Sequence, residues 1–242
     1  RKMFCTFAAM KLKEIIRLLA FDADDTIWDC QTYFDAVERE YCQILSAYGS
    51  ATAISEALFA VETANMPLLG YGCKAFVLSL VENAIAVSNG TIAATDIARI
   101  TQLGRSLLEL PGEPLVGVEA TLGQLRKTGR YKMVVFTKGE LLDQENKLRR
   151  SRLERYFDDV VIVSDKTPEA YRRLCRRFGC QINELLMVGN SFRSDISPVL
   201  QLGGYAIHIP HHAVWQHEVA EEYAHERLLT VNSFADILPH LD

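Results

Sequence analysis

The sequence has little of several features that would define a specialised class of protein. No apolar run approaches the roughly 20 residues that a membrane-spanning helix needs, and there is no internal repeat or low-complexity segment. Basic residues are in deficit, with 26 Lys and Arg against 31 Asp and Glu and a net charge of −5. This balance argues against a nucleic-acid or membrane partner. What remains is the composition of a soluble globular protein, with 49% hydrophobic residues.

The six cysteines form no pattern typical of a disulfide framework or a metal site. They lie at positions 5, 30, 42, 73, 175 and 180, with no CxxC pair and no metal-ligand spacing. A chain of 242 residues can bury a substantial core without disulfide support. We therefore expect reduced thiols and a cytoplasmic location.

The order of apolar patterns predicts an α/β core interrupted by a helical insert. Residues 15–21 form a short apolar run typical of a buried strand, whereas residues 32–110 show helical spacing with almost no strand signals. After a turn cluster at residues 111–114, strand and helix patterns alternate, which predicts a parallel sheet. The later strands are expected at residues 131–137, 160–164, 185–189 and 205–209, and the helices between them at residues 118–128, 141–151, 168–178 and 195–201.

Polar residues that suit phosphate and metal binding follow the expected strands. In a parallel sheet, the binding crevice lies beyond the carboxyl ends of the strands. Carboxylates, lysines, hydroxyl groups and an amide would therefore converge on one edge, which suits a divalent cation and a phosphate. The residues that follow the first four strands or end them are Asp22, Asp24, Thr26, Thr137, Lys138, Gly139, Asp165, Lys166, Gly189, Asn190, Ser191 and Asp195.

The carboxylates among these residues can divide the chemistry of phosphate transfer. Asp22 and Asp24 are two positions apart, so on extended backbone both can face the same side. One can act as nucleophile and the other as general acid and then general base. Oxygen ligands from Asp22, Asn190, Asp195 and a backbone carbonyl suit Mg²⁺.

The remaining polar residues can bind the phosphate. Lys166 can screen the repulsion between a carboxylate and an incoming anion, and Thr137 can donate a hydrogen bond to a phosphoryl oxygen. Main-chain N–H groups near Gly139 can assist, and Lys138 adds positive charge beside them. We also expect Thr26 to take part in substrate binding.

Four short motifs carry a resemblance to a known family. DADDT, VVFT, SDK and VGNSFRSD, in this order, resemble the four motifs of the haloacid dehalogenase-like superfamily of phosphotransferases. A helical cap inserted between the first and second motifs is also a feature of that superfamily. The resemblance extends from Ile15 to about Pro210. It implies that Asp22 forms an aspartyl-phosphate, and that Asp24 protonates the leaving oxygen, then activates water and contributes its main-chain carbonyl to Mg²⁺.

The resemblance also assigns the phosphate-binding roles and a reaction class. Thr137 and Lys166 match the hydroxyl and the lysine of the family. True haloacid dehalogenases lack an acid at the position of Asp24, which favours a phosphatase. Two positions depart from the family pattern: Asn190 stands where aspartate is usual, which removes a negative charge from the metal site, and Lys138 stands where asparagine is common.

The fold class implied is α/β: a doubly wound, Rossmann-like parallel sheet with an inserted all-helical cap. We expect the core at residues 10–29 and 111–242 and the cap at residues 30–110. Met10 opens a more natural start, so we expect residues 1–9 to be an upstream extension or a remnant of cloning.

Several of these features have simpler interpretations. DADDT could be an acidic turn, although an EF-hand loop fails because Ile27 occupies the position that needs glycine. The histidine-rich segment 208–218 lacks the HExxH spacing and is better interpreted as a polar loop than as a zinc site. Tyr71 and Lys74 lie in the cap loop that is the best candidate for substrate contact, but the same glycines also mark a plain turn between helices.

The sequence therefore predicts a Mg²⁺-dependent phosphatase that acts on a small phosphorylated metabolite. A sugar phosphomutase of the same fold is the nearest alternative. The other is a non-catalytic regulator that binds a phosphorylated metabolite, an alternative that Asn190 keeps open. The sequence determines neither the substrate nor the oligomeric state.

Overall fold

The computed structural model describes residues 12–242, which form two compact units. Unit 1 comprises the chain up to Asp29 together with Gly112–Lys138 and Leu148–Asp242, and unit 2 comprises Cys30–Pro111 and Gly139–Lys147. Residue 111 and the segment Gly139–Lys147 thus cluster with the helices of unit 2. The expected extension at residues 1–9 lies outside the described residues.

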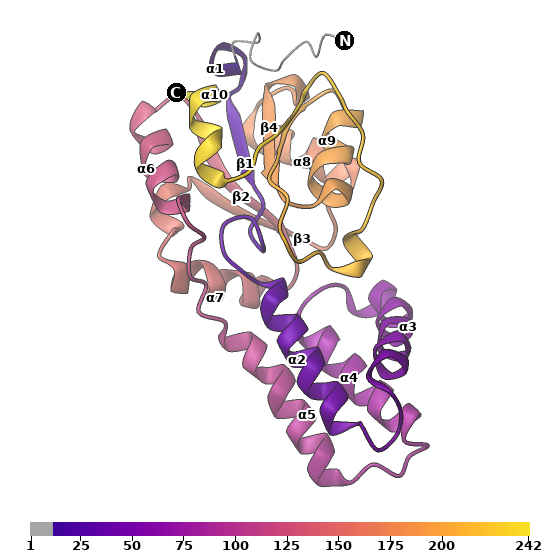
Figure 1. The fold of residues 1–242 in the computed structure, drawn as a ribbon. Helices are drawn as coiled ribbons and strands as arrows, with labels where there is room; N and C mark the ends of the chain where they lie inside the picture. Colours follow the sequence, from indigo (N-terminus) through magenta and orange to yellow (C-terminus); the bar gives the residue numbers. More distant parts are fainter. Residues whose placement is uncertain (1–11) are drawn as a thin grey trace. The chain divides into compact units, whose positions relative to one another are not determined.

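Unit 1 is built on a six-stranded sheet of order β3-β2-β1-β4-β5-β6, in which every neighbouring pair is parallel. Strand β1 lies in the middle, between β2 and β4 (Figure 1). Its first residue, Leu18, pairs with Lys132 on one side and with Leu185 on the other. The predicted parallel α/β fold is confirmed. The strands are β1 (Leu18–Phe21), β2 (Lys132–Lys138), β3 (Asp159–Val163), β4 (Leu185–Gly189), β5 (Tyr205–His208) and β6 (Leu228–Thr230).

Neighbouring residues of β1 enter two separate cores, because successive side chains of a strand point to opposite faces. Leu19 and Phe21 are buried in a core that includes residues of α6, α7 and α10, whereas Leu18 and Ala20 are buried in a core with residues of α8 and α9. Helices therefore cover both faces, as expected for a doubly wound sheet. The helices that begin or end in unit 1 are α1 (Leu12–Ile15), α6 (Val118–Thr128), α7 (Leu141–Ser151), α8 (Pro168–Phe178), α9 (Ser197–Gln201) and α10 (Leu238–Leu241).

Unit 2 consists mainly of four helices around a core of its own. The hydroxyl of Tyr41, fully buried in this core, donates to the carbonyl of Leu80 at 3.0 Å and accepts from Asn83 at 2.8 Å. The break between the second and third of these helices lies at Gly70 and Gly72, whose φ angles of +70° and +130° favour glycine. The helices are α2 (Gln31–Ile44), α3 (Ala51–Leu69), α4 (Cys73–Val87) and α5 (Ala94–Ser106).

The chain leaves and re-enters unit 1 at adjacent points. Trp28 forms an isolated antiparallel bridge with Pro114, and the N–H of Leu115 donates to the carbonyl of Ile27 at 3.0 Å. The residues that precede and follow unit 2 are therefore joined to each other within unit 1.

The structure differs from the sequence prediction at three short segments. The first strand begins at Leu18, because Leu12–Ile15 forms helix α1; β6 was not predicted; and a π-helical segment, Phe192–Ile196, precedes α9. No helix within residues 12–242 combines the length and apolar character needed to cross a membrane. The 3-10 segments are Leu107–Glu109, Glu154–Tyr156, Ile182–Glu184, Gln216–Glu218 and Phe234–Ile237.

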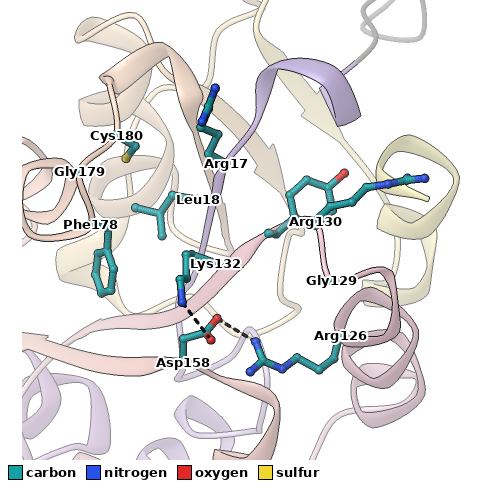
Figure 2. Close-up of a pocket in the computed structure, with 11 residues that line it drawn as sticks. Arg17, Leu18, Arg126, Gly129, Arg130, Lys132, Asp158, Phe178, Gly179 and Cys180 are labelled. Atoms are coloured by element: carbon teal, nitrogen blue, oxygen red, sulfur yellow. Dashed lines mark hydrogen bonds and ion pairs between the residues drawn. The ribbon is translucent and has the colours of Figure 1, made fainter.

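The two edges of the sheet differ in chemistry. The acidic motif residues follow the carboxyl ends of the strands, whereas the amino ends of β1 and β2 border a cavity of about 610 Å³ (Figure 2). Its charged lining residues are Arg17, Arg126, Arg130, Lys132 and Asp158.

Candidate active site

Asp22 stands at the end of the central strand because the chain continues to pair with β4 beyond β1. Its N–H donates to the carbonyl of Val188 at 2.9 Å. The chain then turns sharply: the N–H of Ile27 donates to the carbonyl of Ala23 at 2.9 Å, and Asp25 adopts a φ of +60°. This turn presents the DADDT side chains at the carboxyl edge of the sheet.

Lys166 is buried between two carboxylates. Its ammonium group donates to Oδ1 of Asp22 and to Oδ1 of Asp195, the latter at 2.6 Å. The side chains of Lys166 and Asp195 are each only 1% exposed, and that of Asp22 is 10% exposed. One buried cation thus links residues that follow three different strands.

The charges of this cluster depend on one another. Burial opposes the charge on Lys166, but the carboxylates of Asp195 and Asp22 outweigh it and raise the pKa of Lys166 to about 12. Burial and the neighbouring charge of Asp22 raise the pKa of Asp195, although Lys166 opposes this shift. Removing any one charge would therefore leave the others poorly compensated.

Asn190 joins this cluster through a shared hydroxyl group. Thr26 Oγ1 lies 2.9 Å from Oδ2 of Asp22 and 3.1 Å from Oδ1 of Asn190, and it accepts the N–H of Asn190 at 3.1 Å. The main-chain carbonyl of Asn190 lies 3.0 Å from Nε2 of His208. The carboxylate and amide oxygens of Asp22 and Asn190 are thus held close together, an oxygen donor set of the kind that Mg²⁺ prefers.

Asp195 approaches the backbone at the end of β4. A Cβ on Gly189 would lie 2.2 Å from Oδ2 of Asp195, so only glycine fits there. The same Oδ2 accepts the N–H of Ser191 at 3.0 Å. Asp195 lies within the π-helical segment, a type of local irregularity that is frequent at functional sites.

Asp24 is oriented by a residue that the motif analysis did not single out. The indole Nε1–H of Trp28 donates to Oδ1 of Asp24 at 2.7 Å, and the Trp28 side chain is almost fully buried. Because the Trp28 ring is buried, its hydrogen bond restricts the orientation of the Asp24 carboxylate.

The predicted phosphate-binding residues at the end of β2 have different surroundings. Thr137 is buried, and its hydroxyl lies 3.4 Å from the carbonyl of Lys138. Lys138 donates to Ser194 Oγ at 3.0 Å and forms an ion pair with Glu218. Glu218 also accepts hydrogen bonds from the hydroxyl groups of Ser191 and Ser194.

Glu218 is a charged residue at this edge that sequence reasoning missed. Its side chain is only 12% exposed. Burial opposes the charge of Glu218, but the charge of Lys138 and the hydrogen bonds donated by Lys138, Ser191 and Ser194 outweigh burial and lower the pKa of Glu218. It belongs to the segment that was interpreted as a polar loop, far along the chain from Lys138. No local pattern signals a contact of this kind.

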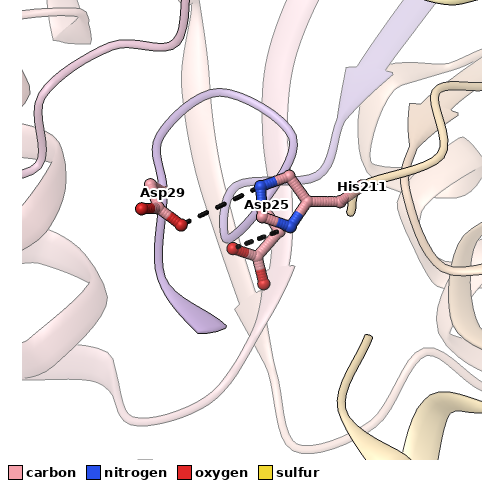
Figure 3. Close-up of side chains that lie close together, drawn as sticks. All are labelled: Asp25, Asp29 and His211. Atoms are coloured by element: carbon pink, nitrogen blue, oxygen red, sulfur yellow. Dashed lines mark ion pairs between the residues drawn. The ribbon is translucent and has the colours of Figure 1, made fainter. Parts of the chain in front are cut away.

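A second group of possible metal ligands lies around His211 (Figure 3). Nδ1 of His211 lies 3.6 Å from Asp25, and Nε2 lies 3.8 Å from Asp29, so the ring faces both carboxylates. The segment 208–218 therefore contributes a histidine to an acidic loop. Each of the three residues offers one atom that could bind a cation.

The remaining predicted substrate contacts belong to unit 2. The ammonium group of Lys74 lies 2.6 Å from Oε2 of Glu140. The main-chain N–H of Lys74 donates to Oε1 of the same carboxylate at 3.3 Å. Gly139, with a φ of +136°, and Tyr71 also lie in this unit. The role of these residues in substrate binding stays a prediction.

Comparisons with known proteins agree on one family. The sequence model of a family described as haloacid dehalogenase-like hydrolase matches residues 16–203. A solved structure of a haloacid dehalogenase-like family hydrolase from Xanthomonas campestris is 35% identical, with a TM-score of 0.82, over 94% of this chain and 92% of that one.

Two curated relatives are named phosphatases. Glyceraldehyde 3-phosphate phosphatase of Pyrococcus abyssi is 27% identical over 201 residues, which cover 78% of this chain and 79% of the relative. N-acylneuraminate-9-phosphatase of Homo sapiens is 30% identical over 91 residues, which cover 36% of each chain.

Proposed function

Since the chain belongs to the haloacid dehalogenase-like hydrolase family, we propose that it is a Mg²⁺-dependent phosphatase that acts on a small phosphorylated metabolite. The observation that carries this proposal is the pairing of Asp22 with the buried ammonium group of Lys166, beside a second carboxylate, Asp24, held by Trp28. The names of the curated relatives support the same reaction class.

In the first step, a carboxylate oxygen of Asp22 attacks the phosphorus of the ester, and the bond from phosphorus to the leaving oxygen breaks. Asp24, protonated at this stage, gives its proton to that oxygen, so the product leaves as an alcohol. Lys166 reduces the repulsion between the Asp22 carboxylate and the incoming phosphate. The hydroxyl group of Thr137 donates a hydrogen bond to a phosphoryl oxygen.

In the second step, Asp24 accepts a proton from water, and the water oxygen attacks the phosphorus of the aspartyl-phosphate. The bond between phosphorus and Asp22 breaks, which releases inorganic phosphate, restores the Asp22 carboxylate and leaves Asp24 protonated, as at the start. Trp28 orients Asp24 in both steps through its hydrogen bond at 2.7 Å.

The residues at the carboxyl edge fit a magnesium ion. Asp22, Asn190, Asp195 and the main-chain carbonyl of Asp24 would hold it, and the oxygens of Asp22 and Asn190 already share one hydroxyl partner. When bound, the ion neutralises part of the charge that the phosphate brings. Because asparagine supplies no charge, we expect weaker Mg²⁺ binding than an aspartate at residue 190 would give.

We further propose that unit 2 acts as the cap and that Tyr71 and Lys74 select the substrate. Caps that close over a site exclude water and sort substrates by contact. We also propose a reducing, cytoplasmic setting, because the five cysteines that the structure describes form no disulfide with one another. They are Cys30, Cys42, Cys73, Cys175 and Cys180.

Release of inorganic phosphate from a panel of phosphate esters tests this proposal. We expect turnover with Mg²⁺, none with a chelator, and a loss of at least a thousandfold in Asp22→Asn. Asp96→Asn, in helix α5, removes a carboxylate elsewhere and should keep the parental rate. Product analysis separates hydrolysis from phosphate transfer to a sugar hydroxyl. Mg²⁺ binding without release from any ester would refute the phosphatase and favour the regulator.

A further inference from the structure

We propose that the cavity at the amino-terminal edge of the sheet is a second binding site, for a small molecule that carries a diphosphate group. The cavity is lined only by residues of unit 1 and has a volume of about 610 Å³, which lies in the range of small-molecule sites. Leu18, the first residue of β1, lines the cavity. Asp22 follows the other end of this strand, four residues later and about 13 Å away. A ligand here would not touch the candidate active site, so this inference does not depend on the proposed function.

The first observation is the arrangement of two cations on one carboxylate (Figure 2). Arg126 Nη1 lies 2.8 Å from Oδ2 of Asp158, and Lys132 Nζ lies 3.6 Å from Oδ1 of the same residue. Asp158 is itself fixed, because Oδ2 accepts the N–H of Met133 at 2.9 Å. One carboxylate thus holds two cationic side chains at the rim of the cavity, with only one negative charge between them.

Two further cations complete the lining. Arg17 binds Glu184 through Nε at 2.8 Å, while its side chain stays 76% exposed, so other N–H groups of the guanidinium remain accessible to solvent. Arg130 reaches the hydroxyl of Tyr131. The four cations come from separate points in the chain: the approach to β1, the end of α6, the turn after it and the start of β2.

The charge balance at this edge favours an anion. Helices α6 and α8 end at Gly129 and Gly179, which both line the cavity, and each helix end carries about half a negative charge. The lining holds four cations and one carboxylate, so with the two helix ends counted it keeps an excess of about two positive charges. The carboxylates of Glu184, on Arg17, and Asp242, near Tyr131, lie outside the lining. In a chain of net charge −5, such an excess of positive charge marks a site for an anionic ligand.

The shape of the cavity favours an organic ligand over a bare ion. Figure 2 shows Phe178 and Leu18 on one side of the cavity, and Arg126 and Arg130 on the other. Arginine forks suit phosphate oxygens, and the aromatic ring offers a face on which a planar group can pack. A nucleoside diphosphate combines the two kinds of group.

Isothermal titration with ADP and with inorganic pyrophosphate tests the site. The titrations use the full chain with Asp22→Asn, so that no phosphate is turned over, and a chelator. We expect saturable binding that weakens with salt, and a Kd at least tenfold higher in Arg130→Gln/Lys132→Gln. Arg39→Gln/Arg105→Gln removes the same charge from helices α2 and α5 and should leave Kd within twofold.

The outcomes separate this site from the candidate active site. Binding of either probe that the cavity substitutions weaken supports the proposal, and tighter binding of ADP assigns part of the affinity to the apolar side. Absence of binding by both probes up to about 5 mM, or equal binding by the cavity and control variants, overturns it. Phosphate release by Arg130→Gln/Lys132→Gln without ADP should equal that of the parent chain, so failure of the proposed phosphatase would be seen independently.

Discussion

Replacement of Lys166 by methionine should lower the free energy of unfolding more than replacement of any other lysine in unit 1. The substitution keeps the length and apolar stem of the side chain but removes the charge that lies between Asp22 and Asp195. Both carboxylates then remain in a site where the lysine side chain was only 1% exposed. The expected effect follows from the burial of these three groups.

Two estimates bracket the magnitude. The rise in the pKa of Lys166 from its ordinary 10.5 to about 12 corresponds to about 2 kcal/mol of stability, which is fully present at pH 7 because it is lost only above pH 10.5. Removal of one partner from a buried ion pair typically costs about 3–5 kcal/mol. We therefore expect Lys166→Met to lower the free energy of unfolding by about 2–5 kcal/mol at pH 7.5.

Urea unfolding followed by circular dichroism, in buffer with a chelator, measures this loss. The loss of stability should become smaller as the pH falls from 8 to 5, because Asp195 has a raised pKa in the folded state and takes up a proton in this pH range. Lys166→Met/Asp195→Asn should recover part of the stability, and the exposed control Lys132→Met should change it by less than about 0.5 kcal/mol. A loss below about 1 kcal/mol, or one independent of pH, would show that the cluster is not balanced as described.

Three further changes test other parts of the structure. Trp28→Phe removes the hydrogen bond to Asp24 and should lower kcat/KM for phosphate release about tenfold or more; an unchanged value would mean that the bond does not orient the acid. Burial raises the pKa of Glu62 to about 7, so this residue costs stability as the pH rises from about 4.5 to 7. Glu62→Gln should thus increase the free energy of unfolding by about 1–3 kcal/mol at pH 8 and leave it unchanged at pH 4, as urea curves can show. Gly189→Ala places a Cβ 2.2 Å from Asp195 and should lower Tm by several degrees in calorimetry, whereas an equal Tm would contradict the close approach.

Local patterns predicted most of the fold. Helices α6, α7 and α8 begin and end at the residues that the sequence indicated. Helices α6 and α8 each bury an apolar face of helical period, whereas the buried face of α7 is largely polar, with Asp143, Gln144 and Lys147. Strand β6 was missed, because Leu228–Thr230 is only three residues long and pairs on one side alone. So short a segment has no alternation to detect.

The candidate site was predictable where its residues lie next to strand ends. Asp22 follows β1, Lys166 follows β3, and Asn190 and Asp195 both follow β4, and the parallel topology brings these strand ends together. Glu218 could not be found in this way, because its contacts with the end of β2 depend on the path of a long irregular segment. Sequence spacing carries no information about where such a segment returns.

The insertion of unit 2 between β1 and β2 affects the order in which the chain can fold. Leu18 and Lys132 pair although they are 114 residues apart, so β1 and β2 close a long loop. Cys30 and Leu110 share one core within unit 2, whose helices are rich in local contacts that form quickly. If these helices form first, the flexible chain between β1 and β2 shortens by about 80 residues, which lowers the entropic cost of closure by about 1 kcal/mol. The folded helical insert then brings β1 and β2 close together before the sheet forms.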